Sequence, residues 1–458
     1  MSPPLPTLLV PVENQVRELD AKLLFSLVAA ERGYPIILGA RATLHREAAS
    51  LPRGVYVAKS VRALSTRMFK IYRDLGSEIV SWDEESLVRS RNSTFWYRRR
   101  IGKEALDQVR SVFAWGEADA EAFRGFPQGC RPSVHATGNP RLDLTRPELR
   151  GYFDDDVARL RKRYGDFLLV NTNFGLVNHY VDSLTGVAPL PPGESTAEER
   201  AFAEEMIDYR SELFEAFKRM VPSVAKAFPN LRIILRPHPV EKHDPWQEIA
   251  TQHDNVELVQ EGNVLPWLLA ASALIQNGCT TGVEAYTLGV PAVAYEPVSD
   301  GRFDSELPNA LGRRATDLDE LNAQLRDALA NGASSNDSRQ RALAEEHMAS
   351  LDGGLACDRI VDVLDTLYAG KEGPPLERPR AARYAAAWIH CHGRAAWKNL
   401  RAGIPGNRNS ADYQKYRFPG VDLASLRSST DRFAKQLGRF GNIEIRERSA
   451  DVFEIARR

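Results

Sequence analysis

The chain has 458 residues, which is too long for one ordinary domain and sufficient for two domains that each bury a core. Its 60 Lys and Arg residues nearly balance 61 Asp and Glu residues, for a formal charge of -1, and 43% of the residues are hydrophobic. This composition is typical of a soluble globular protein, excludes a peptide hormone, and names no binding partner.

The cysteines and the apolar segments indicate the compartment. Cys130, Cys279, Cys357 and Cys391 lie far apart without metal-ligand spacing, so we expect neither disulfides nor a zinc site. The first residues, MSPPLPTLLVPVE, lack the basic region of a signal peptide, and no apolar stretch reaches the about 18 residues of a spanning helix. We therefore expect a cytoplasmic protein that at most contacts a membrane from outside.

The first part of the chain alternates short apolar runs with helical patterns, which is typical of a parallel sheet with crossover helices. A helix is predicted over residues 14–32, where apolar residues recur at helical spacing before Gly33. The predicted strands are 7–12, 35–40, 54–59, 78–83, 111–116 and 133–139. This pattern predicts a Rossmann-like domain over residues 1–145, followed by an inter-domain linker that begins in the turn-rich segment 138–151 and is assigned to 146–165.

The alternation restarts after the linker and predicts a second Rossmann-like domain over residues 166–375. Its predicted strands are 166–174, 231–239, 256–260, 273–277 and 291–297. The insertion 177–196, ahead of a helix over about 197–220, is long enough to suggest a lid or substrate loop. Helices are predicted within 316–369. The fold class is therefore α/β, with two parallel sheets expected to face a central cleft.

The segment 376–458 differs in composition and reads as a C-terminal helical extension that packs back across the domains. From Arg378 to Arg417 it holds nine basic residues and one acid, Asp412, with interleaved aromatics. A helix is predicted over 423–440 and one or two strands over 442–456.

Residues just after the second-domain strands are the strongest site candidates, because ligands bind at the carboxyl ends of such strands. Arg236 and His238 occur in the sequence RPHP, where Pro237 and Pro239 fix the backbone and the guanidinium suits a phosphate or carboxylate. The alternative is a strand-ending turn whose His caps a carbonyl.

The segment NGCTTGVEA runs from a strand into a helix and predicts an anion site built without a metal. Its glycines would allow close approach of a ligand, and its threonines would add hydroxyls at the positive end of the helix. A plain helix cap is the alternative. The residues singled out are Asn277, Gly278, Thr280, Thr281, Gly282 and Glu284, the last either for a ribose diol or for the helix dipole.

Carboxylates and amides follow other strands. Glu13 and the run Asp83, Glu84 and Glu85 follow first-domain strands and could supply a general base or a nucleophile, or could cap the next helix and be solvated. Asn171 and Asn173 follow the first strand of the second domain and suit hydrogen bonds to a polyhydroxylated ligand.

The segment Arg89–Arg100, RSRNSTFWYRRR, holds five arginines and three aromatics without an acid. It could contact anionic lipid headgroups or a charged acceptor glycan. A nucleic-acid surface is a third interpretation, and a solvated loop is the simplest.

Taken together, the pieces WDEE, TGNPRLD, LLVNTNFGLVN, RPHP, QNGCTTGVEA and YQKYRFPG resemble the bacterial surface carbohydrate biosynthesis proteins, a family that includes the retaining β-Kdo glycosyltransferases. RPHP by itself also occurs in teichoic-acid polymerases. The resemblance implies a GT-B fold and a CMP-Kdo donor, with His238–Pro239 and Thr280–Thr281 at the donor phosphate and Glu284 at the cytidine ribose. It implies no metal and no other cofactor.

The resemblance thus predicts a glycosyltransferase that transfers Kdo, or a related ulosonic acid, to a surface polysaccharide or lipid-linked glycan. Retention implies a covalent adduct on a carboxylate or a front-face mechanism; Glu13, the WDEE carboxylates and Asp208 are candidates, and we favour WDEE. Alternatives are a CDP-glycerol-type glycerophosphotransferase, a non-catalytic nucleotide- or glycan-binding component, and a GT-B epimerase. Peripheral contact with an anionic membrane through Arg89–Arg100 and the basic C-terminal stretch is expected, and nucleic acid is not.

Overall fold

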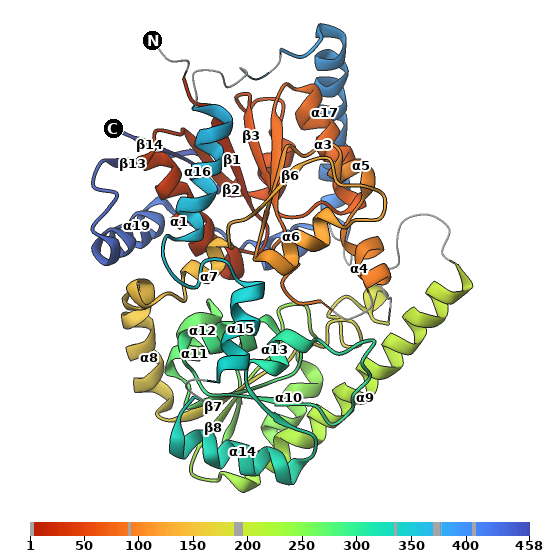
Figure 1. Ribbon diagram of the computed structural model, residues 1–458, viewed down its shortest axis with the longest axis vertical. Helices are drawn as coiled ribbons and strands as arrows, with labels where there is room; N and C mark the ends of the chain where they lie inside the picture. Colours follow the sequence, from red (N-terminus) through yellow and green to blue (C-terminus); the bar gives the residue numbers. More distant parts are fainter. Residues whose placement is uncertain are drawn as a thin grey trace. The chain divides into compact units, whose positions relative to one another are not determined.

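The computed structural model describes residues 4–89, 93–186, 196–333, 337–369, 376, 378–404 and 409–458. By its internal contacts the chain forms two compact units. The first unit comprises Met1–Ser86, Arg100–Tyr152 and Glu346–Arg458, and the second comprises Leu87–Arg99 and Phe153–Glu345. Each unit is a mainly parallel sheet covered by helices, so the predicted pair of Rossmann-like α/β domains is confirmed (Figure 1).

The first unit is built on an eight-stranded sheet in the order β13-β14-β2-β1-β3-β4-β5-β6. All six strands predicted in the first domain are present and pair in parallel. Three of them are buried at every residue and two at all but the first, as continuous apolar runs such as TLLVPV predict for a sheet covered on both faces. The strands are β1 (Thr7–Val12), β2 (Ile36–Ala40), β3 (Gly54–Ala58), β4 (Glu78–Trp82), β5 (Ser111–Ala114), β6 (Ser133–Ala136), β13 (Ile443–Ser449) and β14 (Val452–Arg457).

The second unit contains a six-stranded parallel sheet in the order β12-β11-β10-β7-β8-β9. Read from the other edge, this is the 3-2-1-4-5-6 strand order of dinucleotide-binding folds. The strands are β7 (Phe167–Asn171), β8 (Arg232–Arg236), β9 (Val256–Leu258), β10 (Ala273–Gln276), β11 (Ala292–Tyr295) and β12 (Arg313–Ala315). The connections reverse direction between β7 and β10, and in the first sheet between β1 and β3. Ligands bind such folds at these reversal points.

Helices cover both sheets, and some of them begin or end where the sequence supplies a cap. In the helix over residues 197–227, Thr196 and Glu199 form a reciprocal capping box, and the helix over 280–288 ends at Gly289 in the left-handed conformation. Helices of the first unit are α1 (Gln15–Glu31), α2 (Arg41–Arg46), α3 (Thr66–Asp74), α5 (Lys103–Leu106), α6 (Glu117–Arg124), α7 (Pro140–Asp143), α16 (Ala356–Tyr368), α17 (Ala381–Ala402), α18 (Ala411–Arg417) and α19 (Leu423–Leu437). Those of the second are α4 (Ser93–Arg100), α8 (Asp154–Tyr164), α9 (Ala197–Ala227), α10 (Asp244–Thr251), α11 (Val264–Ala270), α12 (Thr280–Leu288), α13 (Glu306–Ala310) and α14 (Leu318–Asn331), while α15 (Ser338–His347) ends at the division between the units.

The C-terminal extension completes the first sheet. β14 pairs antiparallel with β2, with Phe453 opposite Leu38, and β13 pairs with β14. The close approach requires a glycine in β2, because a Cβ on Gly39 would lie 2.6 Å from the carbonyl oxygen of Asp451. The hairpin therefore covers what would otherwise be an exposed edge at β2.

The turn-rich segment 138–151 is not an extended linker. Its side chains are largely buried, and the Asp143 carboxylate accepts the backbone N–H groups of Ala356 (2.8 Å) and Cys357 (2.9 Å). Asp143 thereby caps the first turn of α16, which also packs against α1. Contacts therefore group residues 346–369 with the first unit, whereas the sequence pattern assigned them to the second domain. The division between the units falls at Tyr152 and Phe153, inside the predicted linker 146–165.

The arginine-rich segment is partly a helix rather than a loop. α4 begins at Ser93, its Phe95 and Trp96 are buried, and Phe95 packs 4.5 Å from the ring of Phe202 on α9. Arg100 is also buried, and it pairs with Asp83 and Glu85. Residues 90–92 of this segment lie outside the described part of the chain. Within the described residues, no helix combines the length and apolar character needed to cross a membrane.

Candidate functional site

The reversal point of the second sheet lies between the ends of β7 and β10, and two buried polar side chains there lack partners. Asn171 ends β7 and is 4% exposed, and neither its amide oxygen nor its amide nitrogen is hydrogen-bonded to any described residue. The hydroxyl of Thr281, in the first turn of α12, is likewise unbonded and buried. Buried polar groups without partners are costly, so both side chains are suited to receive a ligand.

The start of α12 adds a positive helix end to this point. The residue that caps α12 is Cys279, which makes no side-chain capping bond, and Thr280 and Thr281 occupy the first two helical positions. The two hydroxyls therefore do not serve as the plain helix cap that was the alternative interpretation. The N-terminal ends of helices attract anions through their unpaired N–H groups and the helix dipole.

Three other predicted donor-binding residues hold the loop itself. The Asn277 side chain donates to the carbonyl of Tyr295 (2.8 Å), and the Gly278 N–H, at φ 57°, donates to the Asn309 side chain (2.7 Å). A Cβ on Gly282 would lie 2.8 Å from the carbonyl oxygen of Pro308. These contacts fix the path of the chain between β10 and α12. Glu284, the fifth residue of α12, is buried.

His238 follows β8, the strand that pairs with β7. Its Nδ1 accepts the N–H of Val240 (3.3 Å), so in a neutral ring the proton resides on Nε2. The ring is only partly buried. His238 can therefore present an Nε2–H donor while Pro237 and Pro239 restrict its backbone.

Glu241 connects the loops after β7 and β8, and the sequence pattern missed it. Its carboxylate is 1% exposed and accepts four hydrogen bonds. The donors are the Thr172 hydroxyl (2.7 Å), the Phe174 N–H (3.0 Å), the His238 N–H (3.0 Å) and Trp246 Nε1 (3.0 Å). Burial raises the pKa of Glu241, although these hydrogen bonds oppose the rise. Glu241 is thus a positioning residue for His238; its place three residues after His238 was the available signal.

Close packing joins the same two loops. A Cβ on Gly175 would lie 2.3 Å from Val240 Cγ2, so the glycine of NTNFG lets the β7 loop lie against the chain after RPHP. The start of the predicted lid or substrate loop is also fixed here, because Tyr180 N–H donates to the Val240 carbonyl (2.9 Å). Residues 187–195 of that loop lie outside the described residues.

Two arginines contact loops of the candidate site: Arg236, which was predicted to bind the donor, and Arg210, which was not. Arg236 Nη2 donates to the carbonyls of Glu261 (3.0 Å) and Gly262, and burial lowers its pKa to about 10 against the opposing charges of Glu261 and Glu284. Its guanidinium therefore braces the loop after β9. Arg210 of α9 donates to the carbonyl of Asn173 (2.7 Å), and burial lowers its pKa. It adds a cation at the β7 loop that the sequence pattern did not single out.

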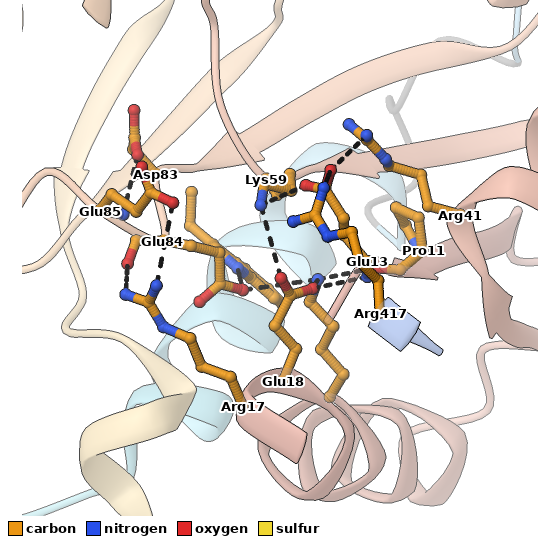
Figure 2. A network of polar contacts seen from close by, with 12 residues as sticks. Pro11, Glu13, Arg17, Glu18, Arg41, Lys59, Asp83, Glu84, Glu85 and Arg417 are labelled. Carbon is orange, nitrogen blue, oxygen red and sulfur yellow. Dashed lines mark hydrogen bonds and ion pairs between the residues drawn. The ribbon is translucent and has the colours of Figure 1, made fainter. Parts of the chain in front are cut away.

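The predicted catalytic carboxylates form a separate network in the first unit, at the carboxyl ends of β1, β3 and β4 (Figure 2). Glu13, which follows β1, pairs with Arg41 after β2, Lys59 after β3 and Arg417 of α18. Burial raises the pKa of Glu13, but these three cations outweigh it and lower the pKa to about 2. Glu13 is therefore ionised at neutral pH and does not suit general-base catalysis, which favours a pKa near the working pH.

The WDEE carboxylates differ in their surroundings. Asp83 is buried and pairs with Arg100, and burial raises its pKa despite that cation. Glu84 is buried, accepts the indole N–H of Trp82 (2.7 Å) and lies 3.5 Å from Lys22 Nζ. Glu85 pairs with Arg17 and Arg100, yet 45% of its side chain is exposed. Of the four predicted catalytic residues, Glu85 thus presents the most accessible carboxylate.

Comparison with known proteins gives a fold but no family. No known family and no curated protein matches the sequence. A structure of a variant of the wall teichoic acid polymerase TagF is similar with a TM-score of 0.51 at 11% identity, over 80% of this chain and 89% of that chain. A second TagF variant, soaked with CDPG, gives 0.50 over the same shares, also at 11% identity. The UDP-GlcNAc 2-epimerase of Methanocaldococcus jannaschii, in complex with UDP-GlcNAc and UDP, gives 0.47 at 12% identity, over 79% of this chain and 99% of that one. With its two parallel-sheet α/β domains and helical C-terminal region, the chain has the GT-B type of fold.

Proposed function

We propose that the protein transfers Kdo, or a related ulosonic acid, from CMP-Kdo to a bacterial surface glycan with retention at the anomeric carbon. One observation carries the proposal: the reversal point of the second sheet holds the unpartnered Asn171 and Thr281, next to the motifs RPHP and NGCTTGVEA. A nucleotide donor is the ligand class that such reversal points accept. The choice of CMP-Kdo follows from the family resemblance that the combined motifs carry.

The chemistry of the donor site follows from charge. When the sugar leaves, the bond between its anomeric carbon and the phosphate oxygen breaks, and negative charge grows on the CMP phosphate. The Nε2–H of His238 and the N-terminal end of α12 are suited to stabilise that charge, so we expect no metal to be required. Asn171 would hydrogen-bond a hydroxyl or carboxylate of the sugar.

The acceptor side is assigned to the first unit. Retention requires either attack by a carboxylate or a front-face mechanism, and we propose that the WDEE segment serves this step through Glu85. The 45% exposure of its side chain is the supporting observation; partial desolvation, which raises the pKa of Glu85, is outweighed by Arg100, Lys59 and Arg17, which hold that pKa well below its ordinary value. An ionised, accessible carboxylate can act as a nucleophile or stabilise a cationic transition state.

A second candidate is a glycerophosphotransferase that uses a CDP-glycerol donor. It is favoured by the similarity in fold to the wall teichoic acid polymerase TagF and by the resemblance of RPHP to teichoic-acid polymerases. Both reactions release CMP, but only this one adds phosphorus to the acceptor. Analysis of the product for phosphorus therefore separates the two candidates.

The test compares CMP release from CMP-Kdo and CMP binding in the wild type, His238→Ala and a control. Loss of one donor that stabilises developing charge lowers the rate about 100- to 1000-fold, so His238→Ala should be severely impaired. His253→Ala is the control, since His253 precedes β9 and lies at the opposite, amino-terminal edge of the sheet. A protein that neither binds CMP nor releases it, with His238→Ala unchanged, would refute the proposal. Binding of CMP without turnover would favour a non-catalytic component, and a thermal shift with UDP in place of CMP would favour an epimerase.

We also propose that the protein contacts an anionic membrane, and that α17 makes this contact. Ile389, Trp397 and Leu400 are 66%, 51% and 79% exposed and share one face of α17, whereas Ala387 and Cys391 on the opposite face are buried. Basic residues flank this face, and no acid occurs between residues 378 and 411. An exposed aromatic and aliphatic face beside arginines is typical of helices that lie in a membrane interface.

Co-sedimentation with phosphatidylcholine vesicles, with and without phosphatidylglycerol, tests this contact. Leu400→Asp should abolish binding to the anionic vesicles, while the same change at Leu64, a leucine of the same unit that is 73% exposed, should not. No binding to anionic vesicles at low salt would contradict the proposal, as would equal binding by both variants. The buried Phe95 and Trp96 leave the segment Arg89–Arg100 less suited to this role.

A further inference from the structure

The first unit contains a polar cavity of about 180 Å³, and Glu13 is the one predicted catalytic residue in its lining. It lies where the chain after β1 and the start of α2 meet α17 and α18. Its lining is Val12, Glu13, Ala40, Arg41, Ala42, His45, Lys398, Asn409, Tyr413, Gln414, Arg417 and Phe418. One water needs about 10–15 Å³ of such space, so the cavity can hold a ligand of several heavy atoms.

The charges of this cavity, which we call the α17–α18 pocket, do not balance. Arg41, Lys398 and Arg417 contribute three cations, and Glu13 is the one carboxylate of the lining. Glu13 is already paired with Arg41 and Arg417 and, beside the pocket, with Lys59 (Figure 2). A net positive charge therefore faces the cavity.

Lys398 is the cation of this lining that has no acidic partner among the described residues. The charges that act on its ammonium group come from Arg394, Arg41 and Arg46. Burial and these neighbouring cations lower the pKa of Lys398 to about 8, which is the expected effect of cations gathered without a counter-charge.

The histidine of the lining, His45, stays neutral. His45 Nε2 is 2.7 Å from the hydroxyl of Tyr56, and burial, with Arg41 and Arg394 nearby, holds the pKa of His45 well below its usual range. Asn409, Tyr413 and Gln414 add polar groups that suit hydroxyls. The lining thus combines an unpaired cation with neutral hydrogen-bonding groups, which is the chemistry that recognises an acidic, hydroxylated ligand.

We propose that the α17–α18 pocket binds the carboxylate or phosphate of an acidic sugar, with Lys398 as its main cationic contact. Anion binding rests on the pocket alone; that the ligand is an acidic residue of the glycan acceptor rests on the proposed function. The basic C-terminal stretch then has two roles, because α17 turns Lys398 toward the pocket and Trp397 and Leu400 toward solvent.

Isothermal titration tests the pocket with two probes, inorganic phosphate and sodium glucuronate, on the protein with and without CMP, so that the result does not depend on CMP binding and any competing site in the second unit is recognised. Glucose is the uncharged control, and sodium chloride at equal ionic strength corrects for screening. Saturable binding of phosphate alone assigns the pocket to a phosphate, and saturable binding of glucuronate alone assigns it to a sugar carboxylate. Binding of both shows that it accepts either group, and binding of neither overturns the proposal.

Three variants locate the binding. Lys398→Gln should weaken it about 10-fold or more, because one charge-assisted contact is lost. Lys398→Arg should retain most of it, which shows that the charge rather than a folding defect is responsible. Lys415→Gln, an exposed lysine of α18 outside the lining, should bind as the wild type does. Equal affinity of Lys398→Gln and the wild type would also overturn the proposal. CMP affinity measured in the same variants tests the donor site separately, since Lys398 belongs to the first unit.

Discussion

Glu241 is the residue whose replacement tests the donor-site geometry most finely. In Glu241→Gln one oxygen remains, and an NH₂ group takes the place of the other. If the amide oxygen keeps the position of Oε1, it still accepts from Thr172, Phe174 and His238. The new NH₂ then faces Trp246 Nε1, which previously donated to Oε2 at 3.0 Å. Two donors therefore face each other in a buried site.

The expected loss of stability follows from this single lost hydrogen bond. A hydrogen bond to a charged acceptor contributes about 1.5–3 kcal/mol, so we expect Glu241→Gln to lower the free energy of unfolding by about that amount. Trp246→Phe removes the indole donor instead. In the double variant no donors face each other, so the two losses should fall short of additivity by about 1–3 kcal/mol.

Urea unfolding followed by far-ultraviolet circular dichroism measures these energies, and titration with CMP measures the site. Glu241→Gln should change CMP affinity less than about 3-fold, since the acceptor for the His238 N–H remains. Glu241→Ala removes that acceptor and should weaken CMP binding about 10-fold or more. Full stability of Glu241→Gln, or strict additivity with Trp246→Phe, would refute the role we assign to Glu241.

Three further predictions follow from individual contacts. Asn171→Ala should weaken CMP binding by up to about 10-fold without loss of stability, whereas Asn277→Ala should lower the free energy of unfolding by about 1 kcal/mol, because of these two side chains only Asn277 has a partner within the protein. Titration with CMP and urea unfolding distinguish the two effects. A loss of stability in Asn171→Ala would contradict this prediction. Gly175→Ala should cost about 1–3 kcal/mol through its clash with Val240, and Val240→Ala should restore stability; no rescue would contradict the packing argument. Burial raises the pKa of Asp143 from 3.8 to about 6 against the hydrogen bonds that it accepts, so the native state binds the extra proton and stability falls as pH rises from about 4 to 6, by about 3 kcal/mol. The difference in unfolding free energy between wild type and Asp143→Asn should show this slope, and a pH-independent difference would contradict it.

Local sequence signals predicted the elements of the fold well. Apolar runs bounded by turn residues located the six strands of the first domain, and helical spacing before Gly33 located α1. α9 was also predicted, but it extends beyond its predicted end near residue 220 to Ala227. Strand existence depends on local burial and β propensity, which a single sequence carries. The two Rossmann-like domains could therefore be predicted from the sequence.

Long-range pairings could not be predicted in the same way. The hairpin β13–β14 joins β2 across about 400 residues of chain, and Asp143 caps α16 across 213 residues. Nothing in the neighbouring sequence of Asp143 indicates its partner, so turn formers in that segment suggested a linker. Such partners are chosen by tertiary packing.

In the candidate site, too, the sequence indicated the local elements but not the partners of individual side chains. RPHP and NGCTTGVEA were singled out as loops that follow strands, and the structure places them at the ends of β8 and β10, because prolines, glycines and threonines have local consequences that a sequence displays. The partners of single side chains are not displayed: Asn277 is bonded internally and Asn171 is not, although both are asparagines after strands. The buried Glu241 reads like any surface glutamate in the sequence.

A crystal structure of the protein with CMP would test the central claim most directly. The account predicts that the CMP phosphate lies within hydrogen-bonding distance of His238 Nε2 and the N-terminal end of α12, with Asn171 or Thr281 bonded to the ligand. CMP bound elsewhere on the chain, with these two side chains still unpartnered, would contradict it.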